Sequence, residues 1–116
     1  DRQRNEVAMA RAMERAAERE TVAMTAMADA ELRMAWSRAR AAERRVTALE
    51  NAAIPKLRET LISIETAYVA GTEKFITLLD AVMELKALEA ARAEAVVRRG
   101  VLRYELQRIA GNQVLP

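Results

Sequence analysis

The chain has 116 residues, of which 52% are hydrophobic but only 3% aromatic, and 25 alanines and 16 arginines stand against three glycines and two prolines. This composition is typical of long helices and coiled coils and excludes a β or mixed α/β domain. Cysteine and histidine are absent, which excludes disulfides, thiolate nucleophiles, imidazole acid–base chemistry and histidine or cysteine zinc sites.

The charges nearly balance, with 19 basic and 17 acidic residues and a formal net charge of +2. Both signs alternate along the first forty residues, for example from Arg2 to Glu20, in the pattern of i,i+4 pairs on a solvated helix face. Phosphate binding requires clustered cations, so no nucleic-acid partner is expected. No apolar run approaches the about 20 residues that span a bilayer, and Asp1–Arg4 does not resemble a signal peptide. We therefore expect this segment to be soluble.

Residues 5–70 are predicted to form one long helix. The stretch contains no glycine and a single proline, Pro55, and it is far longer than the average helix of about 11–12 residues. Proline removes a backbone hydrogen bond and clashes with the preceding turn, so we expect a kink near residues 51–54. A complete break at Pro55 is the alternative.

The first stop signal lies at Gly71 and Thr72. Gly71 can adopt the left-handed conformation that ends a helix. Thr72 can cap the next helix, with Glu73 placed favourably against the positive end of its dipole. A turn confined to residues 70–72 makes the two helices antiparallel neighbours.

The second helix is predicted over residues 73–110. Gly111 supplies its stop, and residues 111–116 form a short tail. Gly100 lies inside the helix, where glycine costs about 1 kcal/mol relative to alanine. We expect Gly100 to permit the close approach of a neighbour.

The two predicted helices match along one apolar seam. In an antiparallel hairpin, the residue numbers of two facing residues add up to a nearly constant value. Pairs of apolar residues from the two helices, such as Val46 with Val96, obey this rule. On the first helix the spacing is heptad up to Ala53 and slips by one residue at Pro55, a stutter that unwinds a coiled coil locally. The seam residues are Leu32, Val46, Ile54, Leu57, Leu61, Ile64, Leu78, Val82, Leu85, Leu88, Val96, Leu102, Leu106 and Ile109. The sequence predicts a single all-α unit over residues 1–116, a long antiparallel coiled-coil hairpin.

Two apolar surfaces have no partner in such a hairpin. The second helix is too short to cover residues 1–31, whose apolar stripe includes Met9, Met13, Met24 and Met27. Near the turn the second helix is apolar nearly all round, from Phe75 to Met83, and a helix apolar on two sides packs on two sides. We expect further helices, from other copies or from a larger parent protein, to complete a helical bundle by association.

Several short motifs resemble one protein family. They are Ile54-Pro55, Ala67-Tyr68-Val69-Ala70-Gly71-Thr72, Phe75-Ile76-Thr77-Leu78-Leu79-Asp80-Ala81 and Leu106-Gln107-Arg108-Ile109-Ala110-Gly111. Together they resemble the last periplasmic hairpin of the TolC-type outer-membrane efflux channels, and the Ile-Pro pair is similar to the heavy-metal branch of CusC/CzcC type. The specific part of the resemblance covers residues 54–111. The rest of the chain is similar in helix length and composition.

The resemblance implies a structural role in transport. Channels of this family are trimers in the outer membrane, and their periplasmic α-barrel is built from helical hairpins. The hairpin tips dock on a periplasmic adaptor protein, which links the channel to an inner-membrane pump. On this resemblance we expect the chain to be a periplasmic fragment of the parent channel, because the sequence contains no β-strand segments. Its adaptor-docking tip would comprise Tyr68, Ala70, Gly71, Thr72, Glu73 and Phe75.

Residues at the predicted tip have two interpretations each. Tyr68 either closes the seam against Phe75 or takes part in adaptor docking or pore closure, and both roles are compatible. Gly71 and Thr72 are required for the turn in any case, and a short exposed turn also permits the close approach of a partner hairpin. Glu73 stands where some members of the family place a basic gating residue, so no gating pair is carried over.

No catalytic, cofactor or metal site is predicted. Methionine thioethers bind soft metals, but methionine also fills cores, and core filling is the preferred interpretation of Met9, Met13, Met24, Met27, Met34 and Met83. Carboxylates such as Glu84 and Glu89 show no arrangement suited to catalysis, so we do not expect an enzyme. The alternative to an efflux conduit is a free-standing coiled-coil interaction module or a periplasmic adaptor hairpin.

Overall fold

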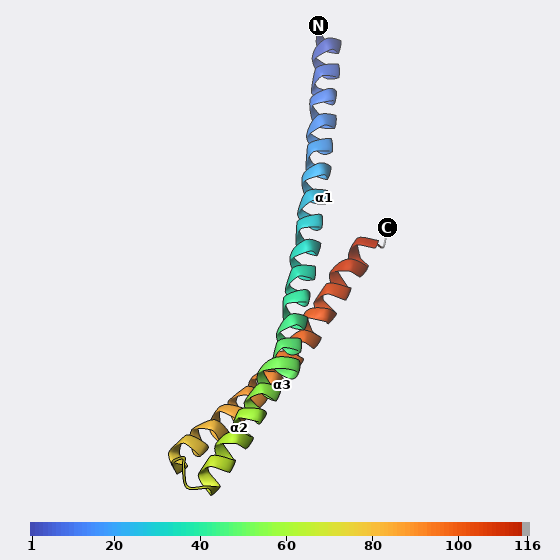
Figure 1. Ribbon diagram of the computed structural model, residues 1–116. Coiled ribbons are helices and arrows are strands. Elements are labelled where there is room, and N and C mark those ends of the chain that lie inside the picture. Colours follow the sequence, from blue (N-terminus) through green and yellow to red (C-terminus); the bar gives the residue numbers. More distant parts are fainter. Residues whose placement is uncertain (115–116) are drawn as a thin grey trace.

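The computed structural model describes the backbone of residues 1–114 and the side chains of residues 1–112, and over this range it contains helices and no strand. Helix α1 (Arg2–Ala48) passes through a π-helical turn, η1 (Leu49–Ala53), into α2 (Ile54–Val69), and α3 (Phe75–Val114) returns alongside them (Figure 1). The molecule measures 100 × 24 × 15 Å along its principal axes. The all-α antiparallel hairpin expected from the sequence is confirmed.

The interruption expected at Pro55 takes the form of a π-helical turn, and the helix continues through it without a break. The N–H of Ile54 donates to the carbonyl of Leu49, five residues back, and Ile54 keeps helical dihedral angles of −67° and −49°. Pro55 lies in the first turn of α2, where a missing N–H and a fixed φ are tolerated. The π turn accommodates one extra residue, and this explains the one-residue slip in the apolar spacing.

The end of α2 is a Schellman motif built on Gly71. Gly71 has a φ of 80°, the only positive φ among the residues described. Its N–H donates to the carbonyl of Tyr68 (3.0 Å), and the N–H of Thr72 donates to the carbonyl of Ala67 (2.9 Å). The Thr72 hydroxyl donates to the same Ala67 carbonyl (3.0 Å). Thr72 therefore caps the end of α2, and the expectation that it caps the following helix is wrong.

Helix α3 begins at Phe75, later than the Glu73 expected. The N–H groups of Thr77 and Leu78 donate to the carbonyl of Lys74 at 3.2 and 3.4 Å, which makes Lys74 the first acceptor of the helix. The Glu73 carboxylate accepts a hydrogen bond from the N–H of Lys74 (3.1 Å). Glu73 thus belongs to the turn. The turn is longer than residues 70–72 because Thr72 is engaged with α2.

The two outer ends of the hairpin also differ from the expected bounds. Helix α1 begins at Arg2, before residue 5, and α3 continues past Ala110 to Val114. Gly111 has no positive φ, so it continues the helix at the modest cost of about 1 kcal/mol for an internal glycine. Of the expected tail over residues 111–116, Leu115 and Pro116 lie outside the described residues.

The core is one narrow seam of apolar side chains, contributed by both antiparallel helices. Every residue of the expected seam is buried or half-buried. Val46, which is 1% exposed, is the most buried of the large side chains. The centre of the seam consists of two clusters, one with Val46, Leu49 and Ala95 and one with Ala39, Ala42 and Leu102.

The N-terminal part of α1 extends beyond the seam. Every residue from 1 to 27 is exposed, and Figure 1 shows the blue end of α1 projecting past the C-terminal end of α3. Near the end of α3, Asn112 borders a shallow surface that includes Thr25 and Asp29. The hairpin therefore has unequal arms, and residues 1–27 of the longer arm are exposed in the part of the chain that the structure describes.

Candidate interaction surfaces

The tip presents a pair of aromatic rings beside an exposed turn. The ring centroids of Tyr68 and Phe75 lie 6.0 Å apart, with the planes tilted by 56°, a favourable geometry for an aromatic pair. Tyr68 is 41% and Phe75 59% exposed, so the pair closes the seam and still offers one face to solvent. Both interpretations of Tyr68 are compatible with this geometry.

The remaining residues of the expected tip lie around the same turn. Ala70, Gly71 and Thr72 are exposed, and Glu73 is half-buried. A Cβ atom at Gly71 would meet nothing within 4 Å, so the space around this backbone is open. Val69 is the most exposed large apolar side chain among the described residues, although it is not part of the expected tip.

Helix α3 carries a second apolar stripe on the side away from the seam. Val97 follows the buried Ala95 by two positions, about 200° around the helix, and is exposed. We call this surface the outer stripe of α3; its residues are Ile76, Leu79, Met83, Val97, Val101 and Tyr104, all exposed. Gly100 lies within it, and a Cβ atom there would meet nothing within 4 Å. Among the described residues, no neighbour comes close to this point.

Helix α1 carries a comparable surface, which we call the Met/Ala stripe. Its residues follow a heptad spacing and are all exposed: Met9, Met13, Ala16, Ala23, Met27, Ala30 and Met34, with Glu20 at the position between Ala16 and Ala23. Met34 directly precedes the buried Ala35, so the stripe lies about 100° around the helix from the seam. The methionines of the chain, Met83 included, are all exposed. The expectation that they fill a core is therefore not met within a single chain.

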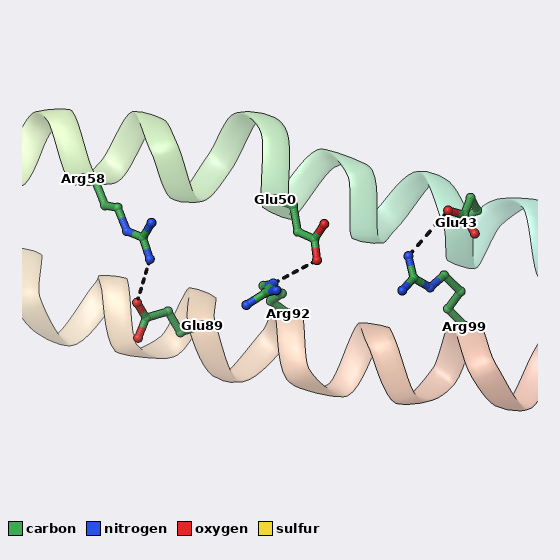
Figure 2. A network of polar contacts seen from close by, with 6 residues as sticks. All are labelled: Glu43, Glu50, Arg58, Glu89, Arg92 and Arg99. Carbon is green, nitrogen blue, oxygen red and sulfur yellow. Dashed lines mark hydrogen bonds and ion pairs between the residues drawn. The ribbon is translucent and has the colours of Figure 1, made fainter.

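One flank of the seam carries ion pairs between the helices (Figure 2). Arg92 Nε lies 2.9 Å from Glu50 Oε1. Arg58 pairs with Glu89 at 3.4 Å, Arg99 pairs with Glu43 at 3.5 Å, and Arg103 also pairs with Glu43. These partly exposed pairs each contribute up to about 1 kcal/mol, so they support the register of the hairpin more than its stability.

The sequence contains a signal for these ion pairs that the seam pattern alone does not use. Arg92 and Arg99 fall at the heptad positions of Leu85 and Leu106. Glu43 and Glu50 are likewise one heptad apart, and their pairing with Arg99 and Arg92 keeps the same sum of positions as the apolar seam. An arginine at a seam position of one helix, with a glutamate at the facing position of the other, therefore predicts an ion pair between the helices.

The described residues offer no cluster of three or more carboxylates that could hold a metal ion. Among the same residues, no helix is both long enough and apolar enough to cross a membrane. Comparisons of the chain with protein-family models, with curated proteins and with solved structures return no match. The fold thus defines an elongated helical hairpin with exposed apolar surfaces, and the resemblance to efflux channels stays a prediction.

Proposed function

We propose that the chain is a structural hairpin without enzymatic activity, which packs laterally against further helices and docks at its tip. The observation that carries this proposal is the outer stripe of α3. Its apolar side chains, such as Val97 and Val101, lie opposite a seam that is already filled by α1. A helix that is apolar on two sides packs on two sides, and contiguous exposed apolar surface marks an interaction site.

In its specific form, the proposal is a hairpin from the periplasmic α-barrel of a trimeric outer-membrane efflux channel. Three features support it: the motifs within residues 54–111, the unequal arms and the exposed turn at Gly71. In such a channel, neighbouring helices would cover the outer stripe of α3 and the N-terminal arm of α1. The parent protein would reside in the outer membrane, and this segment in the periplasm.

The tip is the proposed contact with a periplasmic adaptor protein of a heavy-metal efflux pump. Tyr68 and Phe75 offer an aromatic face, and the open space around Gly71 lets a partner backbone approach closely. Aromatic side chains with one exposed face are the kind of anchor that interfaces favour. The adaptor would connect the hairpin indirectly to an inner-membrane pump.

Site-directed cross-linking at the tip tests this proposal. Val69 is exposed and makes none of the hydrogen bonds that cap α2, so Val69→Cys preserves the turn. We expect it to cross-link to the hairpin tip of a co-expressed heavy-metal-type adaptor. Ser37→Cys, exposed in the last third of α1, is the matched control and should not cross-link. Equal cross-linking at both positions, or at neither, contradicts docking by the tip.

The second candidate is a free-standing coiled-coil interaction module or an adaptor hairpin. It is favoured by the completeness of the seam, which contains two buried clusters and a flank of ion pairs within the one chain. A module of this kind needs no barrel around it. The same Val69→Cys variant separates the candidates, because an adaptor hairpin would cross-link to a channel and not to another adaptor.

A further inference from the structure

The Met/Ala stripe of α1 is a regular surface, and a second copy of this chain fits it. The stripe keeps a heptad spacing from Met9 to Met34 and is exposed along its whole length. Methionines and alanines make up the stripe, with Glu20 at its centre between Ala16 and Ala23. At its inner end the stripe adjoins a shallow groove at the side of the seam, lined in part by Met34, Arg38 and Ile109.

We propose that two copies of the chain pair through this stripe, with their α1 helices antiparallel. In the register that sets Met9 opposite Met34 of the second copy, each residue of the stripe meets another residue of the stripe. Met13 then faces Ala30, and Met27 faces Ala16. In these layers a large side chain lies opposite a small one, which fills the space without a void or a clash, as packed interiors require. The two end layers set Met9 against Met34, and the two central layers set Glu20 against Ala23.

The positions that flank the stripe support the same register. Met24 comes to lie opposite Ala17 of the second copy, again a large residue against a small one. On the other flank each arginine meets an alanine, Arg19 facing Ala26 and Arg33 facing Ala12. Like charges therefore do not oppose one another at these positions, where charges decide partner and orientation in coiled coils.

The inner end of the stripe adds charge complementarity. Glu6 of one copy comes to lie next to Arg38 of the other, twice in the symmetric pair. Arg38 has no carboxylate partner among the described residues, and Glu6 pairs only loosely with Arg2, at 3.6 Å on an exposed surface. The groove beside Met34 and Ile109 thus receives both an apolar and a charged contact from the second copy.

Other arrangements of two α1 helices are less favourable. A shift of the antiparallel register by one heptad sets Arg19 opposite Arg33, and a shift in the other direction sets Arg19 opposite itself. A parallel pair in register sets Glu20 against Glu20 and alanine against alanine at Ala16 and Ala23. Like charges at such positions are destabilising, and facing alanines leave gaps.

The expected dimer is of low affinity. The contact involves residues 6–37, about 48 Å of helix at 1.5 Å per residue, and is about 10 Å wide on each copy. The total buried area is then about 1,000 Å², below the roughly 1,200–2,000 Å² of standard stable interfaces, so we expect a weak dimer with a dissociation constant in the micromolar range. The pairing involves neither the tip nor the outer stripe of α3. It uses the N-terminal arm of α1, which neighbouring helices would cover in the proposed channel, so it concerns the chain outside such a channel and does not rest on the proposed function.

Sedimentation velocity and cross-linking test the pairing on the full chain. We expect a reversible monomer–dimer equilibrium. The chain contains no cysteine, so Met9→Cys and Met34→Cys chains, one of them isotope-labelled, can be mixed and treated with a short bismaleimide. The antiparallel register predicts mixed dimers that contain one chain of each kind. Pairs of Met9→Cys chains indicate a parallel dimer and overturn the proposal, as does a monomer at 100-fold the expected micromolar concentration.

A matched pair of substitutions tests the surface itself. Met27 is 72% exposed and lies on the stripe, whereas Val22 is 69% exposed and lies on the opposite side of α1. Met27→Glu should weaken the dimer roughly a hundredfold, because each dimer loses two buried methionines. Val22→Glu should leave the dissociation constant unchanged, and Glu20→Leu should tighten it. Equal effects of the two glutamates, or none of Met27→Glu, overturn the proposal; circular dichroism confirms that each variant stays helical.

Discussion

Leu49 and Ile54 are five positions apart on one continuous helix, yet both side chains are buried on the face that meets α3. A regular α-helix would turn positions that far apart by about 140° relative to one another. The hydrogen bond from the Ile54 N–H to the Leu49 carbonyl closes a π turn between them and reduces this offset. The single extra residue of η1 therefore keeps the seam on one side of the molecule from α1 into α2.

Removal of one residue from η1 should be tolerated. Deletion of Ala52 converts the π turn into an ordinary α turn and keeps Leu49 and Ile54 on the same face, so we expect the free energy of unfolding to change by less than about 1 kcal/mol. Chemical denaturation followed by circular dichroism measures this change.

The matched control is a deletion from a regular part of the helix. Deletion of Ser63, which is exposed in α2, rotates Leu61 relative to Ile64 by about 100° and removes seam contacts on one side. We expect a loss of at least about 3 kcal/mol, the equivalent of two half-exposed aliphatic side chains. If both deletions destabilise the hairpin equally, η1 does not serve to keep the seam on one face.

Two glycines should respond to alanine in opposite directions. Gly71 has a φ of 80°, so Gly71→Ala should lower the free energy of unfolding by about 1 kcal/mol even though the surrounding space is open. Gly100 lies inside α3 with nothing within 4 Å of an added Cβ atom. Gly100→Ala should raise the free energy of unfolding by about 0.5–1 kcal/mol. Thermal unfolding of both variants checks the signs, and a shift in the same direction would contradict the assigned conformations.

Reversal of the charge at Glu50 should test the ion pair between Glu50 and Arg92. Glu50→Arg places two cations together and should lower the free energy of unfolding by about 1 kcal/mol, a modest value because the Glu50 and Arg92 side chains are partly exposed. The double variant with Arg92→Glu restores opposite charges and should recover most of the loss. A double-mutant cycle by urea denaturation measures the coupling. The coupling should shrink in about 1 M salt; a coupling near zero at low salt would contradict the pair.

The hairpin and its seam could be predicted from the sequence because they follow from spacing alone. The heptad repeat of α1 and the constant pairing sum locate Val46 beside Val96, and both lie in one cluster. The turn at Gly71 was equally predictable, since a positive φ at the end of a helix favours glycine.

Details at the helix ends could not be predicted in the same way. The Thr72 hydroxyl could bind a backbone group either at the end of α2 or at the start of α3. The geometry of the turn places it on the Ala67 carbonyl, at the end of α2. Gly111 likewise resembles a stop, but no packed neighbour forces the chain to turn there. The ion pairs required a comparison of charges across the two helices, which a search for apolar residues omits.

Truncation of the N-terminal arm should separate the stability of the hairpin from that of the proposed dimer. Residues 1–20 are all exposed and contribute nothing to the buried clusters of the seam. At low protein concentration, a chain that begins at Thr21 should therefore unfold with the same free energy as the full chain, within about 0.5 kcal/mol. At high concentration the full chain should gain stability through dimerisation and the truncated chain should not, because binding to the folded state adds to its stability by mass action. Thermal melts over a range of concentrations measure both quantities. A large loss at low concentration would mean that the arm folds back on its own chain, and identical concentration dependence would place the contact between copies elsewhere than on the Met/Ala stripe.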